Sequence, residues 1–130
     1  RRDTLKLLDS VKGLIERGAV PLPRRLDVTA VMLGSEWCLV ALGGEAFCEY
    51  ELWVDKTAPF SHTMVFGYTN GIGGYVATDE ALAMGEKGGY EAGTYPCWWA
   101  EGINGPYYSP PAVGVEARIR EAIASCWSPG

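Results

Sequence analysis

Apolar residues recur at helical spacing near both ends of the chain. Near the start, five aliphatic residues fall three or four positions apart: Leu5, Leu8, Val11, Leu14 and Ile15. Asp3 or Thr4 is placed to cap this helix, and Gly18 is placed to end it. Near the end, a second set shares one helical face: Val115, Ile119, Ala122 and Ile123. The spacing therefore predicts an amphipathic helix at each end of the chain, the later one over residues 113–126.

Between these helices, shorter apolar runs suit strands. Residues 26–33 and 37–42 are rich in β-branched and apolar side chains, and Gly34-Ser35-Glu36 separates them like the turn of a hairpin. Residues 62–67 make a third apolar run. The pattern predicts three strands, of which the first two are neighbours.

Two shorter helices are expected in the same part of the chain. Residues 45–52 have the composition of a short helix, and Thr78 is placed to cap another that runs to about Met84. Residues 85–111 are dense in glycine, proline and aromatic side chains, which is typical of an irregular segment. Helices alternating with strands predict an α/β fold, with strands and flanking helices in a single unit over residues 1–130.

The composition narrows the class of function. Of the 130 residues, 48% are hydrophobic, as one ordinary domain core requires. The 16 acidic and 11 basic residues give a net charge of -5, so the chain lacks the basic surface that a nucleic-acid partner requires. No apolar run approaches the roughly 20 residues of a transmembrane helix. The chain opens at Arg1 without a methionine, and we expect it to be part of a longer protein.

Histidine and cysteine, two common zinc ligands, are sparse and scattered. The four cysteines form no Cys-x-x-Cys pair, which argues against a zinc ribbon and favours free, buried thiols: Cys38, Cys48, Cys97 and Cys126. His62 is the single histidine, so we expect it at the surface or at a strand edge. The sequence contains no Gly-x-Ser-x-Gly nucleophile motif, and residues 70–74 match no phosphate-binding loop.

Two glycine-rich loops follow predicted strands, and each leads to a polar side chain. Gly43-Gly44 precedes Glu45, and residues 70–74 precede Tyr75. Ligand crevices of open α/β sheets form beyond the carboxyl ends of strands, so the two side chains are expected to face one another. Their oxygens suit a metal ion. The alternatives are a helix N-terminal charge for Glu45, a packed aromatic for Tyr75 and a plain turn for the second loop.

Several short motifs follow one another in a specific order. They are Gly44-Glu45, Gly67-Tyr68-Thr69-Asn70, Tyr75, Thr78 and Tyr90-Glu91. In this order and spacing, residues 26–90 resemble the later part of the catalytic domain of the neutral/alkaline non-lysosomal ceramidases. Members of that family are zinc amidases that hydrolyse the N-acyl bond of ceramide. The chain departs from the family at Gly43, where a proline is usual, and in a slightly longer stretch before Tyr90.

The resemblance implies roles for three residues. It implies Glu45 and Tyr75 as zinc ligands, and Tyr90 as a hydroxyl that stabilises the oxyanion at the scissile amide. It also implies a C-terminal fragment of a larger zinc-hydrolase domain, with a lipid-like N-acyl amide as substrate. The two zinc histidines of the family lie upstream of this region, so the upstream part of the same domain becomes the expected partner, and the isolated chain is expected to be inactive.

A noncatalytic α/β binding module is the alternative function. The irregular segment carries two aromatic pairs, Trp98-Trp99 and Tyr107-Tyr108. Such rings combine a large apolar area with a polar edge, so they can form a platform for a lipid or a carbohydrate. The other interpretation, which we favour for most of these rings, is that they pack the irregular segment.

Overall fold

The computed structural model describes residues 9, 12–13, 16–18, 25–71, 74–93, 95–96, 107–108 and 110–127. The chain divides into two compact units. The larger unit comprises Arg25–Thr94 and Ser109–Gly130, and the smaller comprises Arg1–Arg24 and Tyr95–Tyr108. All three predicted site residues belong to the larger unit.

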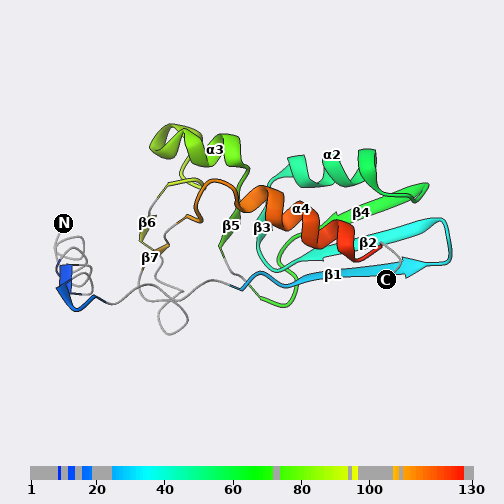
Figure 1. Cartoon of the computed structure of the whole chain (residues 1–130), viewed down its shortest axis with the longest axis horizontal. Coiled ribbons are helices and arrows are strands. Elements are labelled where there is room, and N and C mark those ends of the chain that lie inside the picture. Colours follow the sequence, from blue (N-terminus) through cyan, green and yellow to red (C-terminus); the bar gives the residue numbers. More distant parts are fainter. Residues whose placement is uncertain are drawn as a thin grey trace. The chain divides into compact units, whose positions relative to one another are not determined.

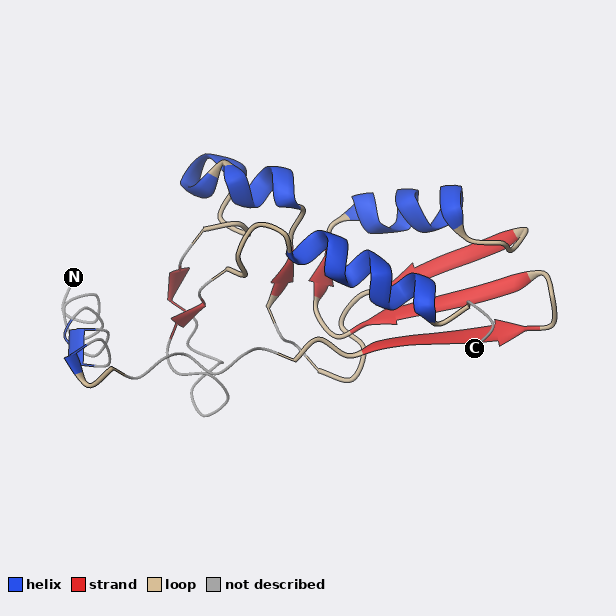
Figure 2. Ribbon diagram, viewed as in Figure 1, coloured by secondary structure: helices blue, strands red, loops and turns tan. Residues whose placement is uncertain are grey.

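A three-stranded sheet is the frame of the larger unit (Figure 1). Strands β1 (Val28–Leu33) and β2 (Trp37–Leu42) pair antiparallel through the predicted hairpin turn. Strand β4 (His62–Phe66) pairs parallel with β2 on the other side, which gives the order β1-β2-β4. The three predicted strands are therefore confirmed, and the fold is mixed α/β with a small sheet and a few helices (Figure 2).

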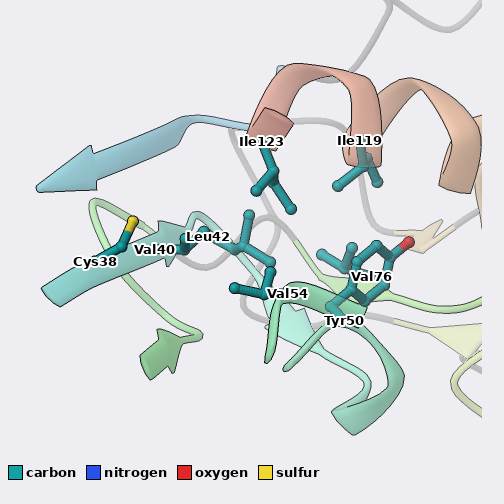
Figure 3. Close-up of a cluster of buried hydrophobic side chains, with 8 residues drawn as sticks. All are labelled: Cys38, Val40, Leu42, Tyr50, Val54, Val76, Ile119 and Ile123. Carbon is teal, nitrogen blue, oxygen red and sulfur yellow. The ribbon is translucent and has the colours of Figure 1, made fainter. Parts of the chain in front are cut away.

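Helices α2 (Cys48–Thr57) and α4 (Val115–Ser125) cover one face of this sheet. Every second residue of β2 points toward them, because side chains alternate along a strand. Buried side chains of β2, α2 and α4 form the main core together with Val76 (Figure 3). Its members are Cys38, Val40, Leu42, Tyr50, Val54, Val76, Ile119 and Ile123. Burial of Ile119 and Ile123 confirms the predicted apolar face of the closing helix.

The opposite face of the sheet carries large apolar side chains that stay exposed. Five of them have exposed fractions between 40% and 56%: Val31, Leu33, Trp37, Met64 and Phe66. The strand register places all five on one face, since Leu33 pairs with Trp37 and Val31 and Met64 both pair with Leu39. We call these five residues the bare sheet face.

A second, two-stranded sheet changes the prediction for Glu45. Strands β3 (Glu45–Ala46) and β5 (Tyr75–Val76) pair in parallel, and the Glu45 N–H donates to the Gly74 carbonyl oxygen at 2.9 Å. The prediction of a helix over residues 45–52 is wrong at both ends. Helix α2 begins at Cys48, because this pairing holds Glu45 extended, and it ends at Thr57. Glu45 is therefore not a charge in the first turn of a helix, and Tyr75 lies in a strand.

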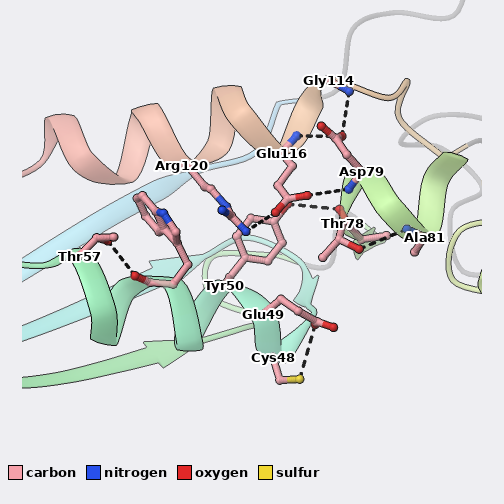
Figure 4. Close-up of polar contacts among 12 residues, drawn as sticks. Cys48, Glu49, Tyr50, Thr57, Thr78, Asp79, Ala81, Gly114, Glu116 and Arg120 are labelled. Atoms are coloured by element: carbon pink, nitrogen blue, oxygen red, sulfur yellow. Dashed lines mark hydrogen bonds and ion pairs between the residues drawn. The ribbon is translucent and has the colours of Figure 1, made fainter.

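Helix α3 (Asp79–Ala83) begins as predicted, with Thr78 Oγ1 accepting from the Ala81 N–H at 3.3 Å. A 3-10 turn, η1 (Gly85–Gly88), follows it. The first turns of α3 and α4 also cap one another (Figure 4). Glu116 Oε2 accepts from the Asp79 N–H at 2.7 Å. Asp79 Oδ1 in turn accepts from the N–H groups of Gly114 at 2.8 Å and Glu116 at 3.3 Å.

The predicted buried thiols are only partly present. Cys38 is buried, Cys126 is partly buried and Cys48 is exposed, and these three are free. Cys97 lies outside the described residues. The buried residues of α2 are Tyr50 and Val54, which face the core. Cys48 is exposed because it begins the helix on the other side.

In the smaller unit, strands β6 (Tyr95–Pro96) and β7 (Tyr107–Tyr108) form an antiparallel pair. Residues 9, 12, 13 and 16 are helical, which agrees with the predicted first helix, although its apolar residues lie outside the described part. Trp98 and Trp99 also lie outside it. In the described residues, no helix has the length and apolar character needed to cross a membrane.

Candidate functional site

The structure brings Glu45 and Tyr75 side by side. They are register partners on the parallel strands β3 and β5. Neighbouring strands lie about 4.8 Å apart, and register partners project from the same side of the sheet. The carboxylate of Glu45 and the phenol of Tyr75 therefore start from adjacent positions on one face, and both residues are partly buried.

Tyr90 joins this pair from the segment after η1. Its hydroxyl lies 3.1 Å from the Tyr75 hydroxyl, and either oxygen can donate the hydrogen bond. The two rings meet edge to face, with centroids 5.5 Å apart and planes at 89°. The Tyr75 hydroxyl holds that of Tyr90 by this hydrogen bond. Tyr90 is nevertheless 63% exposed, so a ligand from solvent can reach it.

Tyr68 is a fourth member that reasoning from the sequence did not single out. A side-chain hydrogen bond with Glu45 is the largest cause that raises the pKa of Tyr68, followed by desolvation. The residue is 54% exposed and follows β4 directly after Gly67. A tyrosine just beyond the carboxyl end of a strand is a signal that could have found it. We call Glu45, Tyr68, Tyr75 and Tyr90 the tyrosine-glutamate cluster.

Two glycines explain why the loops of this cluster approach so closely. A Cβ atom on Gly44 would lie 2.7 Å from the Gly74 carbonyl oxygen and 2.9 Å from Val76 Cγ2. A Cβ atom on Gly67 would lie 2.9 Å from the Gly44 carbonyl oxygen. Only a residue without a side chain permits these backbone contacts, and they set Glu45 beside both Tyr75 and the loop that holds Tyr68.

His62 lies at the opposite end of the parallel strands. It opens β4 and pairs in register with Trp37, whose ring centroid is 4.5 Å from the imidazole. Phe66 lies four positions further along the strand, a rise of about 13 Å. His62 is exposed, which confirms the expected surface position, and it does not belong to the tyrosine-glutamate cluster.

The donor set of the cluster fits part of a zinc site. Structural and catalytic zinc sites use three or four protein ligands, drawn from cysteine, histidine and carboxylate. Glu45 is a carboxylate and Tyr75 is a phenol, a less usual ligand, and the two residues are register partners on neighbouring strands. Within the described residues, no group of three or more histidine, cysteine, aspartate or glutamate side chains could hold a metal ion. The two oxygens therefore need further ligands from elsewhere to complete a tetrahedral set.

Comparison with known proteins finds no matching family model, curated protein or solved structure. The resemblance to the ceramidases consequently rests on the motifs between Gly44 and Glu91. The ligand roles of Glu45 and Tyr75, and the role of Tyr90 at the oxyanion, stay predictions.

Proposed function

We propose that this chain forms part of the active site of a zinc-dependent amidase of the ceramidase type, as the C-terminal part of a larger zinc-hydrolase domain. The observation that carries the proposal is the pairing of Glu45 with Tyr75 across β3 and β5. The resemblance assigns these two residues to the metal, although they are 30 positions apart in the sequence. Their adjacency in space is what a shared metal ion requires.

Three members of the cluster have a chemical task in this proposal. Glu45 and Tyr75 would hold the zinc, together with two histidines outside this chain. When bound there, zinc would supply Lewis-acid chemistry, lowering the pKa of a water and polarising the amide carbonyl. Tyr90, whose hydroxyl is already directed at the Tyr75 oxygen, donates a hydrogen bond to the carbonyl oxygen as negative charge develops on it.

The bare sheet face supports a covalently attached partner. Five large apolar side chains remain exposed on this face. A contiguous exposed apolar patch is typical of a surface that a partner covers. We assign this face to the histidine-bearing upstream part of the same domain.

The test uses the full-length protein that contains this chain. Zinc content by elemental analysis and hydrolysis of a fluorescent ceramide are measured for wild type, Glu45→Gln and Tyr75→Phe. Glu49→Gln is the matched control, since Glu49 is an exposed glutamate on α2 outside the cluster. Wild type and control should hold stoichiometric zinc and hydrolyse the amide, while both cluster variants lose zinc.

Tyr90→Phe separates catalysis from metal binding. It should retain zinc and lower kcat by about 10² to 10³, the usual effect of removing one oxyanion donor. A zinc-free and inactive wild-type protein would contradict the proposal.

The second candidate function is a noncatalytic binding module, which the exposure of Tyr68 and Tyr90 favours. Tyr68 and Tyr90 are 54% and 63% exposed, which leaves two phenol rings open to a lipid or a sugar. The platform first expected at Trp98-Trp99 falls outside the described residues. If the full-length protein binds ceramide vesicles without zinc, and Tyr68→Ala and Tyr90→Ala abolish that binding, the noncatalytic function replaces the amidase.

A further inference from the structure

Strand β4 forms one edge of the three-stranded sheet (Figure 1). The His62 N–H donates to the Glu36 carbonyl oxygen at 2.9 Å, so His62 directs its backbone groups at β2. Successive residues of a strand direct their N–H and C=O groups to opposite edges, so Thr63 and Val65 direct theirs away from β2. In the described part of the chain, no strand pairs with this outer edge. It therefore offers backbone donors and acceptors at the spacing that another strand would use.

This edge lacks the features by which proteins protect a free edge strand. Free edges commonly carry lysine, proline or a bulge, each of which discourages pairing with a further strand. The sequence of β4 contains neither lysine nor proline. Its register with β2 also runs without a bulge, from the pair of Trp37 and His62 to the pair of Ala41 and Phe66. We therefore expect this edge to be covered in the native protein.

A hollow of about 480 Å³ lies along the beginning of this edge. It is lined on the helix-covered side of the sheet by Thr63 and by Asp55 of α2, whose carboxylate accepts a hydrogen bond from the Thr63 hydroxyl. On the other side it is lined by Trp37 and Met64, two members of the bare sheet face. The hollow thus has room for side chains on both faces, as a strand added beside β4 would require.

The helix-covered side of the edge is acidic. Glu51 and Asp55 lie one turn apart on α2, and both are exposed. Trp53 stacks on Trp127, which follows α4, with ring centroids 6.3 Å apart. Glu51 is about 200° round the helix from Trp53, so these two carboxylates lie on the flank of α2 turned away from α4 and toward β4. Lys56 lies about 100° round the helix from Asp55 and does not neutralise this flank.

We propose that the outer edge of β4 pairs with a fourth strand in which basic and apolar side chains alternate, and that the upstream part of the full-length protein supplies this strand. Alternate residues of such a strand would lie beside the Glu51 and Asp55 carboxylates. The others would lie beside Met64 and Phe66, which are both 42% exposed. A strand from the same polypeptide covers the edge permanently, because its effective concentration is high. The inference rests on the proposed function in taking this chain to be part of a larger domain.

Residue-resolved amide hydrogen exchange, measured by mass spectrometry on the full-length protein, tests the pairing. The N–H groups of Met64 and Phe66 point at β2 and should exchange slowly in either case. Thr63 and Val65 should exchange as slowly as these two, since each would donate to the fourth strand. If Thr63 and Val65 exchange faster by about 10-fold or more, the effect of one missing hydrogen bond, the edge is free and the inference is overturned.

Two variants test the charge of the added strand. Asp55→Asn keeps an oxygen that can accept from the Thr63 hydroxyl, and Glu51→Gln keeps the size of the side chain. Each removes one exposed ion pair, so exchange at Thr63 and Val65 should become about 1.5- to 5-fold faster. Glu49→Gln is the matched control, since Glu49 lies about 200° round α2 from Glu51, and it should leave both rates unchanged. Rates in Asp55→Asn and Glu51→Gln that equal the control's would overturn the basic character of the strand.

The source of the strand is tested by repeating the measurement on diluted protein. Exchange that stays slow at Thr63 and Val65 supports a strand from the same polypeptide. Exchange that accelerates on dilution would show that a second copy supplies the strand, and would overturn the proposed source. Zinc content is measured on the same samples, so that the two proposals can fail separately. A covered edge in a zinc-free protein would remove the amidase and leave the strand, and a free edge in a zinc-loaded protein would do the reverse.

Discussion

The mutual capping of α3 and α4 offers a quantitative test of the fold. Asp79 and Glu116 are 37 residues apart, and each carboxylate accepts a hydrogen bond from the first turn of the other residue's helix. Asp79→Ala removes two acceptor contacts, to the N–H groups of Gly114 and Glu116. Glu116→Ala removes the contact to Asp79 and also the ion pair with Arg120.

The expected losses follow from these contacts. A helix cap contributes about 1 kcal/mol, with a range of about 0.5–2. Asp79→Ala should therefore lower the free energy of unfolding by about 1.5 kcal/mol, since its second contact at 3.3 Å is long. Glu116→Ala should cost about 2–3 kcal/mol, because the partly buried Arg120 loses its charge partner and its Nε already lacks a hydrogen bond.

A double-mutant cycle measured by urea unfolding is the assay. Both side chains hold the first turns of α3 and α4 together. The loss of unfolding free energy in the double variant should therefore be smaller than the sum of the two single losses, and the difference should be about 0.5–1 kcal/mol. Glu80→Ala is the control, since it removes an equal charge from the first turn of α3 at an exposed position. It should change stability by no more than about 0.5 kcal/mol. A loss from Asp79→Ala as small as the control's, or strict additivity, would refute the mutual capping.

Three further predictions follow from close contacts, burial and exposure. Gly44→Ala should lower stability by about 1–3 kcal/mol in urea unfolding, because its Cβ would lie 2.7 Å from the Gly74 carbonyl oxygen; a neutral result would contradict the tight turn. Burial raises the pKa of Tyr50, so the stability present below pH ~10 should fall as pH rises further, and Tyr50→Phe should flatten that fall. Matching alkaline slopes in the two proteins would show that Tyr50 is not the cause. In hydroxyl-radical footprinting of the full-length protein, Met64 should be protected relative to Met84, although their exposed fractions here are 42% and 49%. Equal reactivity would mean that no partner covers the bare sheet face.

The longer elements could be predicted from the sequence because their signals are local. Alternating apolar residues and a glycine turn define β1 and β2, and spacing of three and four places Ile119 and Ile123 on the buried side of α4. Thr78 could be recognised as a cap because its acceptor role involves an N–H only three residues away. In each case the residues that decide the structure lie within a few positions of one another.

The candidate site could be predicted only in part. Glu45 and Tyr75 stood out because each follows glycines after an apolar run, but Glu45 was assigned to a helix and the strand of Tyr75 was not predicted. A two-residue strand is too short to show the alternation of apolar and polar residues that marks a strand. Glu45 also lies just before the residues of helix α2, so its neighbours favour a helix. Tyr68 carried no signal beyond its place after a strand.

The sequence by itself determined the three longer strands, the hairpin of the first two, the closing helix and the residue types available for a site. Only the tertiary structure decided that Glu45 is extended and pairs with Tyr75, that Tyr68 is left-handed and that the hydroxyls of Tyr75 and Tyr90 meet. The physical reason is that these features depend on backbone contacts between distant segments, such as Glu45 with Gly74 and Tyr68 with Gly44. Such contacts override the weak local preference for a helix or a strand. They form only because Gly44 and Gly67 allow segments of the backbone to approach closely.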